Sequence, residues 1–401
     1  MTSNSGKFDL LLQGGHVIDP ANEVDGPADV GIRDRKIAAV GPGLSSTNAE
    51  KIVDVTGLLV TPGLIDIHTH HFGVVGRSGS STGVGYTAWI FPDEYAFPNG
   101  TTTVVDAGGA GYKNFHEFKT QIIDKAQVRV LALLNIVGDG MLGVVEQDVS
   151  EMQGAPCAER MMEYPDIIVG VKAAHHRYGW ESVDGAMEAG EMSGKFVMVD
   201  FQPRKERTYK QLILEHMRPG DVHTHMYGQH IEQLDANKIV PDYMWEAREK
   251  GILFDVGHGA GAFWFRIAKP AMEQGWRPDT ISTDAHKNSF FMPRATMPIT
   301  MSKFMNLGMP LNEAIFRSTI EPARVIDRQE LGTLSPGAAA DIAVFELEKG
   351  DFGFIDSGLA SMRGTQRLLA HMTISAGKVV WDLNGISRPD WASQGDYIRL
   401  N

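Results

Sequence analysis

Hydrophobic and polar positions follow two different patterns along this chain of 401 residues. Between residues 61 and 331, eight apolar stretches of strand-like length alternate with polar, amphipathic segments of helical length. The stretches cover residues 64–70, 102–107, 128–137, 167–173, 196–201, 221–226, 252–256 and 280–284. Nearly continuous apolar runs that alternate with helices indicate a parallel sheet buried on both faces. Eight such repeats in about 250 residues predict an α/β fold, a (β/α)8 TIM barrel.

The two ends of the chain have a different hydrophobic–polar pattern. Residues 8–60 are expected to form short strands that are separated by Gly, Pro, Asn and Asp turns. The same pattern returns at 341–345 and 372–381. We therefore predict a small composite β-sandwich domain, built from residues 1–60 and 332–401, beside a barrel domain of residues 61–331.

Composition and charge narrow the range of partners. The chain is 43% hydrophobic and 22% charged, as is typical of globular domains. A net charge of −13 argues against nucleic acid and against an anionic membrane surface. No run approaches the ~20 apolar residues of a membrane helix, and the N-terminus does not resemble a signal peptide. The single cysteine, Cys157, fits a reducing cytosol. We expect a cytoplasmic homo-oligomer that acts on a small molecule.

Histidines collect where the apolar runs end. His68-Thr69-His70 closes the first run, and side chains two apart on a strand point the same way. Imidazole is a common zinc ligand, although an isolated pair is equally well a surface pair. This pair is not isolated, because nine of the 14 histidines lie at or just past run ends. The nine are His68, His70, His71, His175, His176, His223, His225, His258 and His286. We predict a metal site at this rim, where barrel enzymes place their catalytic residues.

A lysine inside the fourth apolar run is the second unusual feature. Burying an ammonium group is costly, so Lys172 either extends its charged end into the barrel mouth or has a lowered pKa. A neutral amine can add CO₂ to form a carbamate. A carbamate is a bidentate anion that can bridge two cations.

Seven segments together resemble the amidohydrolase superfamily of metal-dependent hydrolases, and most closely its deacetylase and dihydroorotase-like branch. They are residues 57–70, 99–103, 170–172, 218–225, 255–259, 282–284 and 331–343. The resemblance runs over nearly the whole chain. It is specific for the superfamily and only weakly informative about the substrate.

The resemblance implies a binuclear site with two divalent cations, for which zinc is the expected metal. The implied ligands are His68, His70 and Asp284 for the more buried cation, carbamylated Lys172 as the bridge, and His225 for the second cation.

The fifth run departs from the pattern, because Asp200 stands where the family has a histidine. Asp200 is either a substituted ligand or a sign that the second site is weak or absent. His223 is a further candidate ligand. It lies two residues before His225, so its side chain would point to the same side of the strand, and this is the only ground for it.

The implied reaction is hydrolysis by metal-activated hydroxide. Asp284 would accept the proton and pass it to the leaving group, as general base and then general acid. His258, in the sequence Gly257-His258-Gly259, would contact the substrate or stabilise an oxyanion, or would only shape that turn. Arg177 follows the fourth run and is a candidate for pairing with a substrate carboxylate.

We expect the substrate to be an amide, with an ester as a side activity, from which a small acyl group such as acetyl is removed. A cyclic amidase of the dihydroorotase or hydantoinase kind is the alternative. Dihydroorotases usually carry an arginine two residues after the second histidine, and Phe72 stands there. A non-catalytic scaffold would have lost ligands, whereas here only the fifth run departs.

Overall fold

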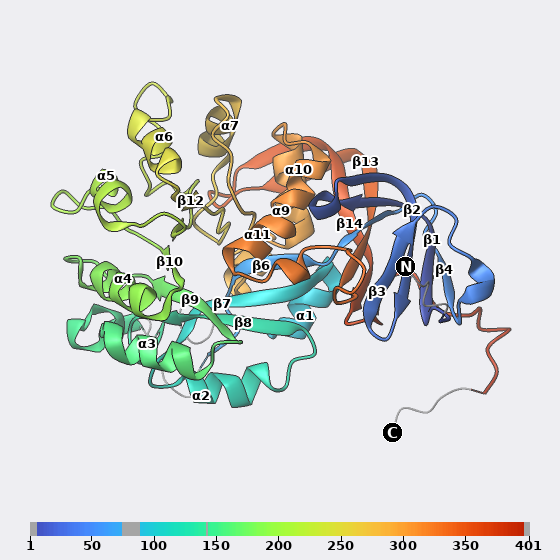
Figure 1. The fold of residues 1–401 in the computed structure, drawn as a ribbon. Helices are drawn as coiled ribbons and strands as arrows, with labels where there is room; N and C mark the ends of the chain where they lie inside the picture. Colours follow the sequence, from blue (N-terminus) through green and yellow to red (C-terminus); the bar gives the residue numbers. More distant parts are fainter. Residues whose placement is uncertain (1–5, 74–88, 142, 397–401) are drawn as a thin grey trace.

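Seven parallel strands in consecutive order form the central sheet, in a computed structural model that describes residues 6–73, 89–141 and 143–396 (Figure 1). The strands are β6 (Leu64–Thr69), β7 (Thr101–Gly111), β8 (Arg129–Asn135), β9 (Ile168–Ala173), β10 (Phe196–Val199), β11 (Val222–His223) and β12 (Leu253–Phe254). Each of the first seven predicted apolar runs overlaps one of them. The predicted parallel α/β sheet is therefore confirmed.

Both faces of this sheet are apolar, which explains why its strands read as nearly continuous hydrophobic runs. On one face Val104 and Val130 pack in a cluster with helix residues such as Phe118. On the other face Val105 and Leu131 pack in a second cluster that includes residues of α11 (Ile320–Val325).

The eighth predicted run, 280–284, is not a regular strand. Isolated parallel bridges join Thr280 to Asp255 and Ala285 to Thr69 of β6. The run is rich in hydroxyl groups, and the buried Asp255 carboxylate accepts hydrogen bonds from Thr280 and Ser282. The segment thus lies between β12 and β6 but is held largely by side chains.

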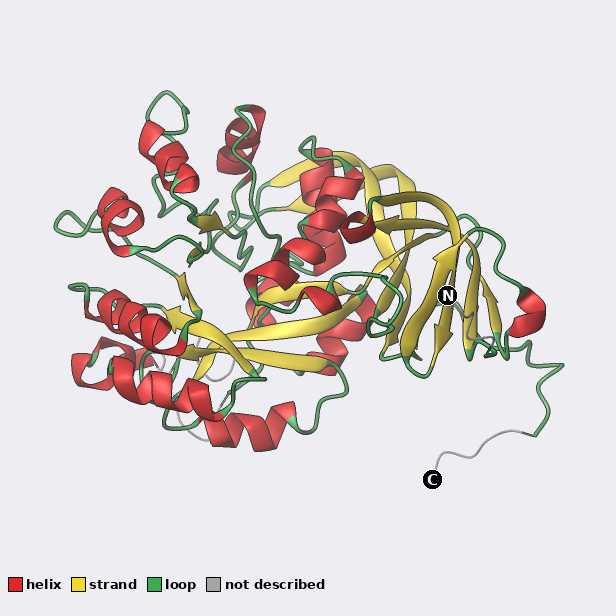
Figure 2. Cartoon of the chain, in the orientation of Figure 1, coloured by secondary structure: helices red, strands yellow, loops and turns green. Residues whose placement is uncertain are grey.

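Helices and helical turns connect the strands. The α-helices are α1 (Pro92–Ala96), α2 (Phe115–Phe118), α3 (Gly154–Glu163), α4 (Glu181–Ser193), α5 (Tyr209–Gln211), α6 (Asp242–Glu249), α7 (Phe265–Glu273), α8 (Lys287–Phe291), α9 (Met297–Asn306), α10 (Leu311–Phe316) and α11. Figure 2 shows helices packed along the outside of the parallel sheet. Within the described ranges, no helix has the length and apolar character needed to cross a membrane.

The strands of both chain ends share one sheet. It has the order β15-β14-β13-β5-β1-β2-β3, and β4 pairs with β1. The strands are β1 (Leu10–Asp19), β2 (Val24–Arg33), β3 (Lys36–Gly41), β4 (Ile52–Asp54), β5 (Leu59–Pro62), β13 (Ile342–Ile355), β14 (Ser361–Ser375) and β15 (Lys378–Asp382). The two ends meet because β5 pairs in parallel with β1 and antiparallel with β13. Their division into two stacked sheets stays a prediction.

Candidate active site

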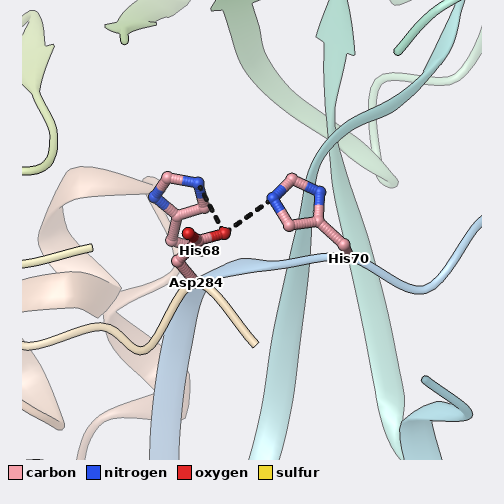
Figure 3. Close-up of side chains that lie close together, drawn as sticks. All are labelled: His68, His70 and Asp284. Atoms are coloured by element: carbon pink, nitrogen blue, oxygen red, sulfur yellow. Dashed lines mark ion pairs between the residues drawn. The ribbon is translucent and has the colours of Figure 1, made fainter. Parts of the chain in front are cut away.

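Three ligand-type side chains meet at the carboxyl end of β6 (Figure 3). Oδ1 of Asp284 lies 2.9 Å from Nε2 of His70 and 3.6 Å from Nε2 of His68. One ligand atom from each residue lies within 4.8 Å of the other two, and all three residues are buried. Burial opposes ionisation, but His68, His286 and His70 hold the pKa of Asp284 well below its usual range. The carboxylate is therefore charged near neutral pH.

A hydrogen bond at Nδ1 fixes the orientation of the His68 ring. The Thr224 hydroxyl donates to Asp255 at 2.7 Å and lies 2.9 Å from Nδ1 of His68. Because that hydroxyl gives its own proton to Asp255, it accepts one from Nδ1–H, and the lone pair stays on Nε2. Burial and the nearby Lys172 lower the pKa of His68 to about 3. His68 is thus held in the neutral form that binds cations.

Lys172 is wholly buried in β9. Its Nζ lies 3.1 Å from Nε2 of His68 and 3.7 Å from the sulfur of Met198. Burial lowers the pKa of Lys172, although Asp200 and Asp284 act against this shift. Gly108 makes room for the lysine, because a Cβ at Gly108 would overlap the Lys172 side chain. The structure therefore places the buried amine directly beside the first cluster.

A second group of ligand-type side chains follows β9, β10 and β11. Oδ2 of Asp200 lies 3.4 Å from Nε2 of His175 and 3.5 Å from Nε2 of His225. Burial alone would raise the pKa of Asp200, but His225 and His175 hold it well below its usual range. Nδ1 of His225 is hydrogen-bonded to the Gly257 carbonyl at 2.6 Å, and Nδ1 of His175 lies 2.7 Å from the Glu146 carboxylate. Both imidazoles thus direct Nε2 to the same oxygen.

One cavity of about 420 Å³ joins the two groups. Its walls include all six predicted metal ligands and further polar side chains to which the sequence analysis gave no individual role. The lining residues are His68, His70, Met141, Lys172, His175, Asp200, Gln202, His225, His230, Ala260, Gly261, Ala262, Asp284, His286 and Asn288.

His258 lies behind this cavity rather than on its wall. It is wholly buried, stacked on Phe263, and its Nε2 is 2.7 Å from Nζ of the equally buried Lys303. Nδ1 bonds to the carbonyl of Gly259 at 2.9 Å. Gly259 in turn packs on Asp284, since a Cβ there would overlap Oδ2 of that residue. His258 therefore reaches the site through the backbone of the loop.

Two other sequence candidates also lie off the cavity wall. Arg177 is half-buried after β9, and its backbone N–H donates to the side chain of Gln147 at 3.0 Å. His223 is buried with Nδ1 3.0 Å from the Tyr209 hydroxyl, and its ring packs near Phe254. His223 is therefore directed into the core and does not join the second group.

His175, Glu146 and Lys303 were given no individual role in the sequence analysis. His175 had a signal, since it is one of the histidines at run ends. Glu146 and Lys303 lie far from the strand ends along the chain, and only the folded chain brings them to His175 and His258.

Comparison with known proteins gives a consistent picture. The amidohydrolase family matches residues 265–380. A deacetylase of Enterococcus faecalis is 30% identical over 382 residues, which cover 93% of this chain and 99% of that protein. The crystal structure of an adenine deaminase superposes with a TM-score of 0.84 at 28% identity, covering 94% of this chain and 100% of the other. That of a dihydroorotase has a TM-score of 0.80 at 27% identity, covering 93% and 97%.

Proposed function

The chain belongs to the amidohydrolase family, and from this premise we propose that it removes a small acyl group from a carboxylate-bearing amide with the help of two divalent cations. The coarser part, a hydrolase that acts on carbon–nitrogen bonds, follows from its relatives. The observation that carries the proposal is the group of His68, His70 and Asp284, with the buried amine of Lys172 3.1 Å from His68. Zinc is the metal that these nitrogen and oxygen donors suit.

In this proposal the hydrolase domain spans residues 61–331, and segment 280–284 closes the seven strands into a barrel. The bridge of Thr280 to Asp255 and that of the next residue after the segment, Ala285, to Thr69 of β6 support that closure. Residues 1–60 and 332–401 form the accessory β-domain, in agreement with the shared sheet. The homo-oligomeric state and the cytoplasmic location stay predictions.

The donor atoms suit cations for a reason visible in their hydrogen bonds. Nδ1 of His68 and Nδ1 of His225 are each engaged with the protein, which leaves Nε2 of each ring for the cavity. His68, His70 and Asp284 would hold the first cation. Asp200, His225 and the carbamate of Lys172 would contribute to the second.

A divalent cation supplies a Lewis acid that polarises a carbonyl and makes bound water more acidic. Asp284 is ionised and faces the cavity, so it can accept a proton from the attacking water. It can then return that proton to the leaving nitrogen, as general base and general acid. His258 supports this step indirectly, because it holds Gly259 against the Asp284 carboxylate. Arg177 is kept as the candidate partner of the substrate carboxylate.

Phe72 favours the deacylase over the cyclic amidase. Its side chain is buried, and its ring lies 5.0 Å from that of Phe118 in the main core. An arginine at this position would have to leave that core to reach a substrate carboxylate. An esterase side activity would use the same residues on an oxygen leaving group.

Metal content and a substrate panel test the proposal. The purified protein should contain two equivalents of zinc and should hydrolyse N-acetyl amino acids faster than dihydroorotate, hydantoins or adenine. Removal of the metal should abolish turnover, and zinc should restore it.

Lys172→Ala should be inactive, with partial rescue by short carboxylates and added metal. Arg177→Ala should raise KM more than it lowers kcat. Turnover that persists after complete metal removal would refute the proposal, and a protein with neither metal nor turnover would be a scaffold.

A further inference from the structure

This chain has Asp200 where its family has a histidine, and the structure places another histidine, His175, beside it. We propose that His175, oriented by Glu146, is a ligand of the second cation and supplies the imidazole that is missing at Asp200, just after β10. The inference rests on the proposed function and assigns a residue to the same site.

The geometry of His175 matches that of an expected ligand. Its Nε2 and the Nε2 of His225 approach the same Asp200 oxygen, at 3.4 and 3.5 Å. His175, Asp200 and His225 all line the cavity that holds Lys172. The opposite nitrogen of His175 lies 2.7 Å from the carboxylate of the buried Glu146. A carboxylate behind an imidazole is the usual outer partner of a metal-binding histidine, because it fixes the ring and makes the free nitrogen more basic.

The backbone gives an independent indication. His175, His225 and Asp284 have φ of +58°, +62° and +47°, in the left-handed region that non-glycine residues rarely adopt. Such conformations are energetically unfavourable and are found preferentially at functional sites. Two of the three residues are expected ligands. The loop of His175 is also held in place, since Gln147 donates to the His175 carbonyl at 2.7 Å.

With His175 included, the two cations have matching ligand sets. The first would be held by two imidazoles and one carboxylate, from His68, His70 and Asp284. The second would be held by His175, His225 and Asp200, again two imidazoles and one carboxylate. The carbamate of Lys172 would be shared between them. The aspartate that stands after β10 in place of a histidine is thereby compensated by a histidine that follows β9.

The adjacent His176 is a matched control. His176 is buried, and its Nε2 pairs with Glu181 at 3.3 Å, but it does not line the cavity. Among the described residues, only the first set has three ligand atoms within 4.8 Å of one another. We therefore expect the second cation to be released first.

Zinc content, measured by elemental analysis after dialysis against a series of chelator concentrations, tests the inference. The wild type and His176→Ala should retain two equivalents, and His175→Ala should retain one. Glu146→Gln should bind the second equivalent about 10–100-fold more weakly, as is usual when the outer partner of a ligand is removed. If His175→Ala does not fold, Glu146→Gln decides the question.

Two equivalents of unchanged affinity in His175→Ala or in Glu146→Gln would overturn the inference. One equivalent in the wild type, unaltered in both variants, would also overturn it, while leaving a mononuclear hydrolase intact. A wild type that binds no zinc would overturn the proposed function as well.

Discussion

Replacing Lys303 by methionine should remove a pH dependence of stability. Lys303 is wholly buried in α9, where Nζ donates to His258 at 2.7 Å and to the Pro293 carbonyl at 3.2 Å. Burial lowers the pKa of Lys303 to about 7, with Arg294 adding to the shift and Asp356 opposing it. The folded protein thus releases this proton near neutral pH.

The size of the effect follows from proton linkage. In the unfolded chain the lysine keeps its proton up to an ordinary pKa of 10.5. Between pH 7 and 10.5 the unfolded state therefore binds one more proton than the native state, and the free energy of unfolding rises with pH. The cost of burying the charge is fully present below pH 7 and is relieved above it. At about 1.4 kcal/mol per pH unit, the gain from pH 6 to pH 9 is about 3 kcal/mol.

Urea unfolding at pH 6, 7, 8 and 9, followed by tryptophan fluorescence of the zinc-loaded protein, measures this gain. Lys303→Met should lack it, after a pH-independent loss of about 1–3 kcal/mol from the unpaired His258 nitrogen. Lys269→Met is the matched control, because Lys269 is exposed on α7 and pairs with Glu273. Other titrating groups act equally in all three proteins, so only differences between the curves matter. Parallel curves for Lys303→Met and the wild type would refute the reasoning.

Three further predictions concern single residues. Asp284→Asn should lower kcat by about 10²–10⁴. An unchanged kcat at unchanged zinc content would rule out the proton shuttle. Gly259→Ala should disturb Asp284 and lower kcat much more than Gly43→Ala does. Gly43 is the control because it has a similar positive φ but open space around it, and equal kcat values in the two variants would contradict the prediction. Burial raises the pKa of Cys157 to about 12, so thiol reagents should label it only after unfolding, and fast labelling of the native protein would disagree.

The sequence was sufficient for the parts of the fold that depend on local pattern. The strand-like runs became the parallel sheet because each is buried on both faces and therefore has to be apolar. His68 and His70 were recognisable because they end the first of these strands, two positions apart. Parallel strands bring their carboxyl ends to one edge, so polar residues there converge.

The parts that escaped prediction depend on contacts between distant segments. The eighth run was expected to be a strand, but its hydroxyl groups bond to the Asp255 carboxylate and it forms only isolated bridges. His258 was expected to contact the substrate or to shape its turn, and the structure places its ring behind the cavity, against Lys303 and Phe263. No sequence periodicity indicates that Lys303, on α9, contacts His258, which lies in a loop 45 residues earlier in the chain.

The position of His175 shows why ligands can move between strands without the site being lost. At a sheet edge where parallel strands end together, a side chain can reach the cavity from the last residue of a strand or from the loop just beyond it. His175 does so two residues past β9, where a left-handed turn directs its ring to Asp200. Such a turn is costly, but the surrounding hydrogen bonds to Glu146 and Gln147 hold it. A missing histidine on one strand is therefore weak grounds for inferring a missing cation, unless the loops after the neighbouring strands also lack a donor.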